Sequence, residues 1–258
     1  MPIPKSEIRN PALAAAPKGA KSEILPFAWR VSGASYLACL LASFALGLWP
    51  QAVDPRLSGA AVLPTLRGVA LGQVFFILLV YPLCAAWRAQ RRSRQDAALP
   101  ANVATSPWTS AARIALEWLG YAIVSVPFYL AGCWFADATA QDAFRTALAV
   151  AAFLPAGMIA ACWMHRPAAR PIVLLLALLA LFAAPAACYV ILEFLPRFKA
   201  TAAAVWAFAP LTFTWDAANS RGDRWLPQPA WSILFWLGLT AAAGFLRLAI
   251  GRRRKEEG

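Results

Sequence analysis

The sequence predicts an all-α fold, a polytopic bundle of six transmembrane helices with a re-entrant or interfacial hairpin before the last one. Six apolar stretches of about 20 residues carry this prediction, because a helix of that length crosses a hydrocarbon core of roughly 30 Å. They cover residues 31–53, 68–87, 114–136, 147–164, 171–195 and 231–250. The composition agrees, with 61% hydrophobic residues, a mean hydropathy of +0.58 and 12 Trp.

The basic residues predict the orientation of the bundle. With the N-terminus in the cytoplasm, seventeen of the 24 Lys and Arg residues fall in cytoplasmic segments and seven fall outside. This bias predicts a multi-pass protein with both termini cytoplasmic. The first 25 residues lack the apolar core of a cleavable signal, which fits the bacterial inner membrane. The net charge of +12 sits at helix ends and not on one face, so no nucleic-acid partner is expected.

The N-terminal region has two predicted parts. Residues 1–21 are rich in Pro, Ala and Lys and are expected to form a disordered cytosolic tail. Residues 22–30 gather apolar side chains between charges, as an interfacial helix along the inner leaflet does. The start of the first crossing is an equally good interpretation of the same residues. The transmembrane domain is predicted to occupy residues 31–258.

Two connecting segments have distinctive sequences. Between the second and third crossings, Ser106 is suited to cap a helix and Pro107 to occupy its first position. Residues 200–215 are apolar but short and are broken by Pro210, which favours a re-entrant or interfacial hairpin over a crossing. A seventh crossing there would also place the basic C-terminus outside, so six crossings are favoured over seven.

Soluble-enzyme chemistry is not expected. The chain has no phosphate-loop motif, one histidine (His165), and five cysteines without a C-x-x-C pair. No catalytic, cofactor-binding or metal-binding residue is therefore predicted. Glu117 follows Arg113 by four residues, and Glu193 precedes Arg197 by four, so both acids are expected in local ion pairs. Neither is placed as a mid-membrane proton relay, which disfavours a proton-coupled transporter.

Small residues and prolines have open interpretations. The patterns Ser43-xxx-Gly47 and Gly68-xxx-Gly72 favour close helix packing, for which a dimer interface is one candidate place. Prolines are common in membrane helices, and they also form kinks that can shape a substrate path. Those concerned are Pro82, Pro127, Pro155, Pro185 and Pro210.

Several short motifs occur in a recognisable order. A basic segment leads into ATSPWTSAAR at residues 104–113, CWMHRPAAR follows at 162–170, APLT at 209–212, and a basic run ends the chain. This order resembles the membrane subunit of ABC-2 type exporters. The family's E-R-E-x-G-T run is replaced here by RRSRQD at 91–96, without Glu or Gly. Either the contacts to an ATPase would be altered, or this chain would be a divergent member of the family.

The resemblance implies a permease subunit of an ATP-binding cassette exporter that works by alternating access. ATP and Mg would be bound and hydrolysed on a separate ATPase subunit, and a second permease subunit and membrane lipids would be further partners. Candidates for coupling to the ATPase are Arg88, Arg91, Arg92, Arg94, Asp96, Ser106, Pro107 and Trp108. Candidates for the substrate path are Tyr36, Phe75, Phe76 and Tyr81. The apolar, charge-poor bundle favours an amphiphilic or lipid-like substrate. A non-transporting membrane scaffold is the alternative.

Overall fold

The computed structural model describes residues 20–53, 64–96, 107–136, 138–164, 166–219 and 232–245, and these residues form helices and turns without a β-strand. The predicted all-α fold is confirmed for them. In chain order the elements are α1 Ala20–Val53, α2 Pro64–Phe75, η3 Phe76–Val80, α3 Tyr81–Asp96, α4 Pro107–Ala136, α5 Ala140–Ala151, α6 Leu154–Met164, η4 Pro167–Ala169, α7 Arg170–Leu178, η5 Leu179–Ala183, α8 Ala184–Phe194, η6 Pro196–Phe198, α9 Lys199–Phe208 and α10 Pro210–Asn219. A last helix covers Ser232–Phe245.

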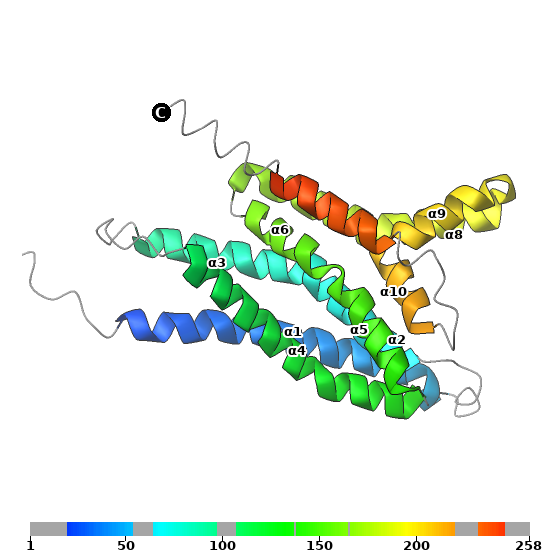
Figure 1. Ribbon diagram of the computed structural model, residues 1–258, viewed down its shortest axis with the longest axis horizontal. Helices are drawn as coiled ribbons and strands as arrows, with labels where there is room; N and C mark the ends of the chain where they lie inside the picture. Colours follow the sequence, from blue (N-terminus) through cyan, green and yellow to red (C-terminus); the bar gives the residue numbers. More distant parts are fainter. Residues whose placement is uncertain are drawn as a thin grey trace, which may run out of the picture.

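Five of the described helical stretches are long and apolar enough to cross a membrane, which identifies a membrane-spanning helical protein. They are Arg30–Leu48, Thr65–Arg91, Leu116–Phe135, Ala140–Met164 and Pro167–Phe194. The long helices lie side by side in one bundle, and the chain passes back and forth between the two ends of this bundle (Figure 1). These stretches coincide with the first five predicted crossings. Of the sixth, the described part is the Ser232–Phe245 helix, which is shorter than a full crossing.

The first helix is longer than a membrane crossing requires. Its 34 residues span about 51 Å at 1.5 Å per residue, against a hydrocarbon core of roughly 30 Å. Residues 22–30 continue into the first apolar span without a break, which matches the second of the two interpretations of that segment. Residues 1–19 of the predicted tail lie outside the described residues.

Two prolines account for the two π-helical turns, η3 and η5. Pro82 follows η3 by two residues, and Pro185 follows η5 by two residues. A proline has no N–H to donate to the carbonyl four residues earlier, and its ring crowds that carbonyl. The carbonyls concerned, those of Leu78 and Leu181, lie inside the π-helical turns, where the wider turn accommodates the ring. By contrast, α4 continues through Pro127 as one helix.

Two other prolines stand where a helix ends. Pro155 is the second residue of α6, and α5 ends at Ala151, the residue whose carbonyl this proline crowds. Pro210 opens α10, and Ala209 before it has φ −71° and ψ 130°. That extended backbone is the conformation a residue before proline prefers. The predicted interruption of residues 200–215 at Pro210 is therefore present, and the segment forms two helices.

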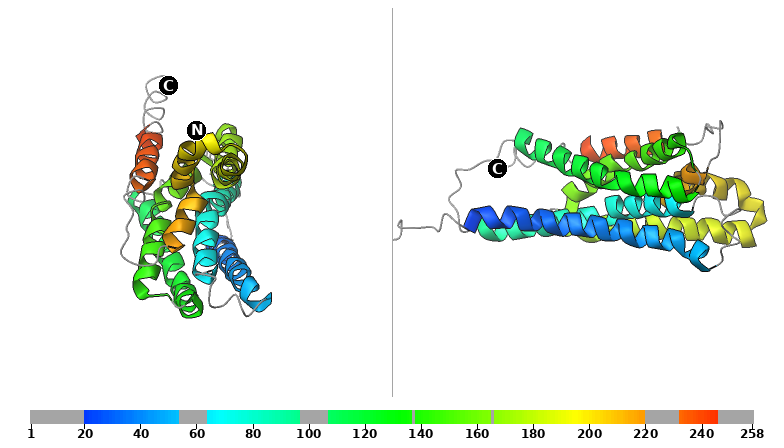
Figure 2. Two further views of the ribbon diagram at one scale, coloured as in Figure 1. Left: turned by 90° about the vertical axis from the view of Figure 1, so that its right-hand side faces the viewer. Right: turned by 90° about the horizontal axis from the view of Figure 1, so that it is seen from below.

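The helices α9 and α10 lie in different surroundings. α9 folds back along α8, where the Cys188 Sγ donates to the carbonyl of Ala202 at 3.5 Å. α10 packs instead against α2 and α5. The α8–α9 pair projects from one end of the bundle (Figures 1 and 2). We call residues 170–208, from α7 to α9, the α7–α9 arm.

Small residues bring α1 and α2 into close contact within the chain. A side chain at Gly68 would meet the backbone carbonyl of Ser43 and lie 3.4 Å from the Cα of Gly47. A side chain at Gly72 would meet the hydroxyl of Ser43. The two small-residue patterns therefore face each other inside one protomer, and they do not need a dimer interface to explain them.

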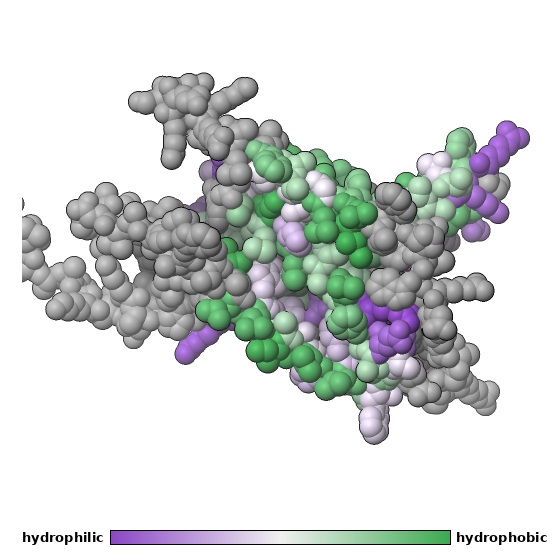
Figure 3. Space-filling view, in the orientation of Figure 1, coloured by the Kyte–Doolittle hydropathy of each residue, from purple (hydrophilic) through white to green (hydrophobic). Residues whose placement is uncertain are grey.

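The second apolar span is the centre of the bundle. Its residues Leu66, Val69 and Phe76 belong to a buried cluster with α1 and α4. Its residues Val74 and Ile77 belong to a second cluster with α5, α6 and α10. On the face shown in Figure 3, hydrophobic residues predominate along the bundle, and hydrophilic residues gather at the tip of the α7–α9 arm and in a patch over α10. This span positions the candidate site described next.

Candidate functional site

The helix α4 carries a polar stripe that faces the interior of the bundle. Glu117, Tyr121, Ser125 and Tyr129 recur every four residues, and each is less than one tenth exposed. The helix exposes mostly apolar side chains elsewhere, among them Leu116, Leu119, Ile123, Val126 and Leu130. A helix surrounded by lipid is expected to show this inverted pattern, because buried polar groups must find partners inside the protein.

Glu117 is the centre of a buried ion pair. Its Oε1 lies 2.6 Å from a terminal nitrogen of Arg88, and the side chains are 5% and 13% exposed. The hydroxyl of Tyr121 donates to the same Oε1 at 2.7 Å, and that of Ser32 donates to it at 3.2 Å. Three donors from α1, α3 and α4 therefore converge on one carboxylate oxygen. This ion-pair cluster ties those three helices together.

Aromatic rings surround the ion-pair cluster. The Arg88 guanidinium lies 5.7 Å from the centre of the Tyr81 ring, and that ring lies 4.6 Å from Trp118. The ring of Tyr121 lies 4.7 Å from that of Tyr36 and 5.3 Å from that of Phe76. These rings shield the ion pair, and the lower local polarity strengthens its electrostatic attraction.

A second hydrogen-bonded set lies deeper in the bundle. The Gln73 amide nitrogen donates to the Tyr36 hydroxyl at 2.8 Å, and the Tyr129 hydroxyl donates to the Gln73 carbonyl oxygen at 2.6 Å. Both ends of this buried amide are therefore satisfied. Contact between the rings of Tyr36 and Tyr121 joins this set to the ion-pair cluster. Polar groups thus extend from one end of α4 toward its middle.

The partner of Glu117 is a correction to the sequence-based expectation. Glu117 was expected to pair locally with Arg113, but it pairs with Arg88, 29 residues away in the chain. The side chain of Arg113 lies outside the described residues. Glu193 is exposed, and among the ion pairs of the described residues none joins it to Arg197. The signal for the site was present in the four-residue spacing of polar side chains on α4.

The predicted coupling residues flank the segment between α3 and α4. Arg88 lies in the ion-pair cluster, and the Arg91 guanidinium stacks 4.2 Å from the Trp87 ring centre. Arg92, Arg94 and Asp96 belong to α3, but their side chains lie outside the described residues. Pro107 is the first residue of α4, as predicted, and Trp108 follows it. The side chains of Pro107 and Trp108, and all of Ser106, fall outside the described part.

The predicted substrate-path residues are packed inside the protomer. Tyr36, Phe76 and Tyr81 are at most 3% exposed and belong to one cluster of rings. Phe75 points elsewhere and packs against Phe182 of η5, with ring centres 6.3 Å apart. The structure therefore brings three of the four together around the ion-pair cluster and places the fourth between the second and fifth spans.

A second charged group lies at the opposite end of the bundle. The Arg67 guanidinium of α2 lies 4.5 Å from the centre of the Trp215 ring of α10. The next residue, Asp216, accepts a hydrogen bond of 2.7 Å from the indole N–H of Trp206 in α9. These contacts attach α10 to α2 and α9.

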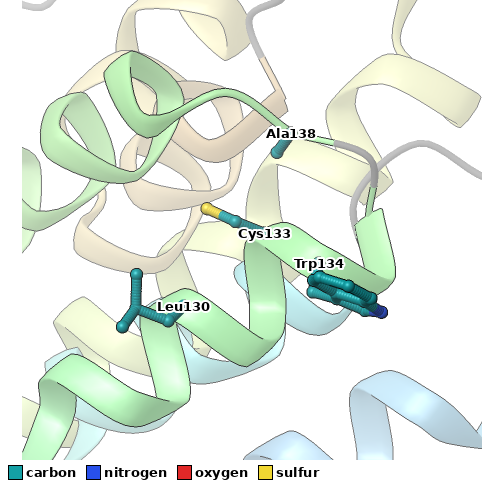
Figure 4. A pocket seen from close by; sticks show the side chains of 4 residues that line it. All are labelled: Leu130, Cys133, Trp134 and Ala138. Carbon is teal, nitrogen blue, oxygen red and sulfur yellow. The ribbon is translucent and has the colours of Figure 1, made fainter.

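No described cluster of His, Cys, Asp and Glu side chains is suited to hold a metal ion. A shallow hollow near the end of α4 is lined by Leu130, Cys133, Trp134 and Ala138 (Figure 4). Its polar groups include the Cys133 thiol, which donates weakly to the Thr139 carbonyl at 3.8 Å. The ion-pair cluster joins side chains from three helices and is therefore taken as the candidate functional site.

Comparisons of this chain with protein-family models, with curated proteins and with solved structures find no match. The functional proposal therefore depends on the geometry of the ion-pair cluster and on the sequence motifs.

Proposed function

We propose that this chain is the membrane-spanning permease subunit of an ATP-binding cassette exporter, driven by a separate ATPase subunit. One observation carries the proposal. The two helices that flank the segment predicted to meet the ATPase, α3 and α4, are joined by the buried ion pair Arg88–Glu117. Ser32 of α1 binds the same carboxylate. A force applied to that segment would therefore act on three membrane helices at once.

The ion-pair cluster suits a two-state element. A buried ion pair is stable only while its geometry is good, so intermediate arrangements are unfavourable. Closure of the ATPase would move the ends of α3 and α4 and would either keep the Arg88–Glu117 pair or exchange its partners. On this mechanism the pair acts by positioning helices, and ATP and Mg stay on the partner subunit.

The order of helices also supports the proposal. The resemblance to ABC-2 type exporters implies a short helical hairpin before the last crossing, and α9 and α10 occupy that place in the chain. α10 reaches back to α2 through Arg67 and Trp215, so it would close the end of the bundle opposite the coupling segment. We infer six crossings, with the last one including Ser232–Phe245, and both termini in the cytoplasm.

The exposed apolar surfaces support an amphiphilic or lipid-like substrate and a second permease subunit. The α7–α9 arm exposes a large apolar face to the surroundings of the protomer, including Phe182, Tyr189 and Phe194. A second permease subunit would cover part of that face and enclose a path for an amphiphilic or lipid-like substrate. Tyr36, Phe75, Phe76 and Tyr81 would reach this path only when the helices move apart.

The experiment is purification of the tagged chain in mild detergent, followed by mass spectrometry of stoichiometric partners. We expect a soluble subunit with a phosphate-loop motif beside the wild-type chain. The triple variant Arg91→Glu, Arg92→Glu and Arg94→Glu should lose that subunit, because reversed charges repel a surface that binds arginines.

The matched control is the double variant Arg197→Glu/Lys199→Glu, which reverses charge at the opposite end of the bundle. This variant should keep the partner. Recovery of the wild-type chain without an ATPase, or with other membrane proteins only, would favour the scaffold and reject the exporter.

A further inference from the structure

Described charges are distributed unequally between the two ends of the bundle. Among the residues whose side chains the structure describes, five arginines lie at the end where α1 begins, α3 ends and α7 begins, and Glu117 is the one acidic residue there. They are Arg30, Arg88, Arg91, Arg166 and Arg170. Glu117 is already paired with Arg88. The opposite end is nearly balanced, with Arg67, Arg145, Arg197 and Lys199 against Asp142, Glu193 and Asp216. An anionic partner therefore suits the first end.

The basic residues of two helices reach the same level of the bundle. The second and fourth spans pack in parallel, because Gly157 fits directly against the backbone of Ile77 and Ala161 shares a buried cluster with Tyr81. Because α3 also packs against α6, Arg91 on α3 and Arg166 just after α6 lie at the same end of the bundle. The ends of α3 and α6 and the start of α7 therefore form one basic region.

The arginines of this region are held by aromatic rings and by backbone. Arg91 stacks on Trp87 at 4.2 Å, and Arg166 stacks on Trp163 at 5.3 Å from the ring centre. The Arg170 Nε donates to the carbonyl of Met164 at 2.9 Å. Stacking uses the flat face of a guanidinium, and the N–H edge of a guanidinium can donate two hydrogen bonds to two oxygens of one phosphate. Tryptophan at this position also marks the level of lipid headgroups.

Apolar surface begins directly beside the basic region. Ile172, Leu175 and Leu176 follow Arg170 on α7, and they are 59%, 57% and 60% exposed. A ligand that suits this surface has an anionic head for the arginines and apolar chains for α7. We propose that Arg166 and Arg170, with Trp163, bind the phosphate headgroup of an anionic phospholipid whose acyl chains lie along α7. This inference does not depend on the proposed transport function.

Native mass spectrometry of the full chain in mild detergent tests the proposal. The protein is titrated with phosphatidylglycerol or with phosphatidylcholine of the same acyl chains. Arginines near a membrane surface each favour anionic lipid by about fivefold, so we expect about 25-fold tighter binding of phosphatidylglycerol through two of them. The double variant Arg166→Gln/Arg170→Gln should bind both lipids alike. The control Arg197→Gln/Lys199→Gln, at the opposite end, should keep the wild-type preference.

Three results would overturn the proposal. The first is equal binding of the two lipids by the wild-type chain, which needs no variant to interpret. The second is an unchanged preference in the Arg166→Gln/Arg170→Gln variant. The third is full displacement of phosphatidylglycerol by inorganic phosphate, which would assign the arginines to a free anion. In the second case, loss of a protein partner from that variant would also assign the surface to protein contact.

Discussion

The second apolar span and the fifth differ in what surrounds them. The two spans are about equally long. In the second span 61% of the apolar stretch is buried inside the protein, and in the fifth span 11% is buried. The second span packs against α1, α4, α5, α6 and α10 and contains the buried Gln73 and Arg88. The fifth span lies in the α7–α9 arm and has Leu181 and Cys188 as its buried side chains. Hydropathy therefore predicts that both cross a membrane but not which one is central.

The comparison shows how polar groups are used in this bundle. In the second span and its neighbours, the buried polar groups of the ion-pair cluster and of Gln73 find their partners within the protomer. The arm exposes apolar side chains that lipid or a second subunit must cover. The ion-pair cluster and the Gln73 set thus both lie within the first three spans, while most side chains of the arm are exposed.

The largest effect is expected from Glu117→Ala. Arg88 would remain buried without its carboxylate partner, which destabilises by about 3–5 kcal/mol. The measurement is the unfolding temperature in mild detergent. Glu193→Ala, on the exposed part of α8, is the matched control and should change it little. Equal shifts for the two variants would contradict the central role given to the ion-pair cluster.

The double variant Arg88→Met/Glu117→Leu sharpens this test. Replacing both members of a buried ion pair by apolar side chains of similar size is often close to neutral for stability. We therefore expect the double variant to unfold near the wild-type temperature. An unfolding temperature as low as that of Glu117→Ala would contradict this expectation. It would show that the two side chains stabilise the fold by more than neutralising each other's charge.

A smaller effect is expected from Gly68→Ala. The added methyl would meet the Ser43 carbonyl, and such overpacking costs about 1–3 kcal/mol. Gly120→Ala is the matched control, since nothing lies within 4 Å of a side chain there. That control should be neutral or stabilising by up to about 1 kcal/mol, because alanine favours a helix. Thermal unfolding of both variants gives the comparison, and a stable Gly68→Ala would contradict the close packing of α1 on α2.

Gln73→Leu should destabilise the protein less than Gly68→Ala does. It removes the amide between Tyr36 and Tyr129 and so removes the hydrogen bond that each of these two buried hydroxyls makes with it. Hydrogen bonds between membrane helices average about 0.6 kcal/mol, so two of them predict a loss of about 1 kcal/mol. Denaturant unfolding in mixed micelles measures it, with Gln73→Glu as the variant that keeps an acceptor for Tyr129.

The smallest effect is expected in the α7–α9 arm. Leu176→Ala removes an exposed side chain and should change protomer stability by less than about 0.5 kcal/mol. Leu40→Ala, fully buried on α1, should cost about 2–5 kcal/mol. The unfolding temperatures of the two variants test the contrast between the regions, and a reversed order would contradict it.

The sequence predicts the spans better than their contacts. Apolar length alone locates the first five crossings, and the chemistry of Pro82, Pro155 and Pro210 accounts for where helices widen or end. The pairing of Arg88 with Glu117 could not be predicted from spacing, since the two residues lie on different helices and are 29 positions apart in the chain. The four-residue spacing of polar side chains indicates which side of α4 faces inward, but it does not tell which helix supplies their partners.

The most direct test of the central claim is ATP hydrolysis by the complex of this chain with its ATPase subunit, comparing wild type with Arg88→Met/Glu117→Leu. We expect the double variant to retain the subunit, because Arg88 is buried in the ion pair and the other coupling candidates, Arg91 among them, are unchanged. Hydrolysis should fall by about tenfold or more, since the movement of α3 would no longer be passed to α1 and α4. Hydrolysis equal to that of wild type would restrict the ion pair to a structural role, and a wild-type chain that binds no ATPase would contradict the account.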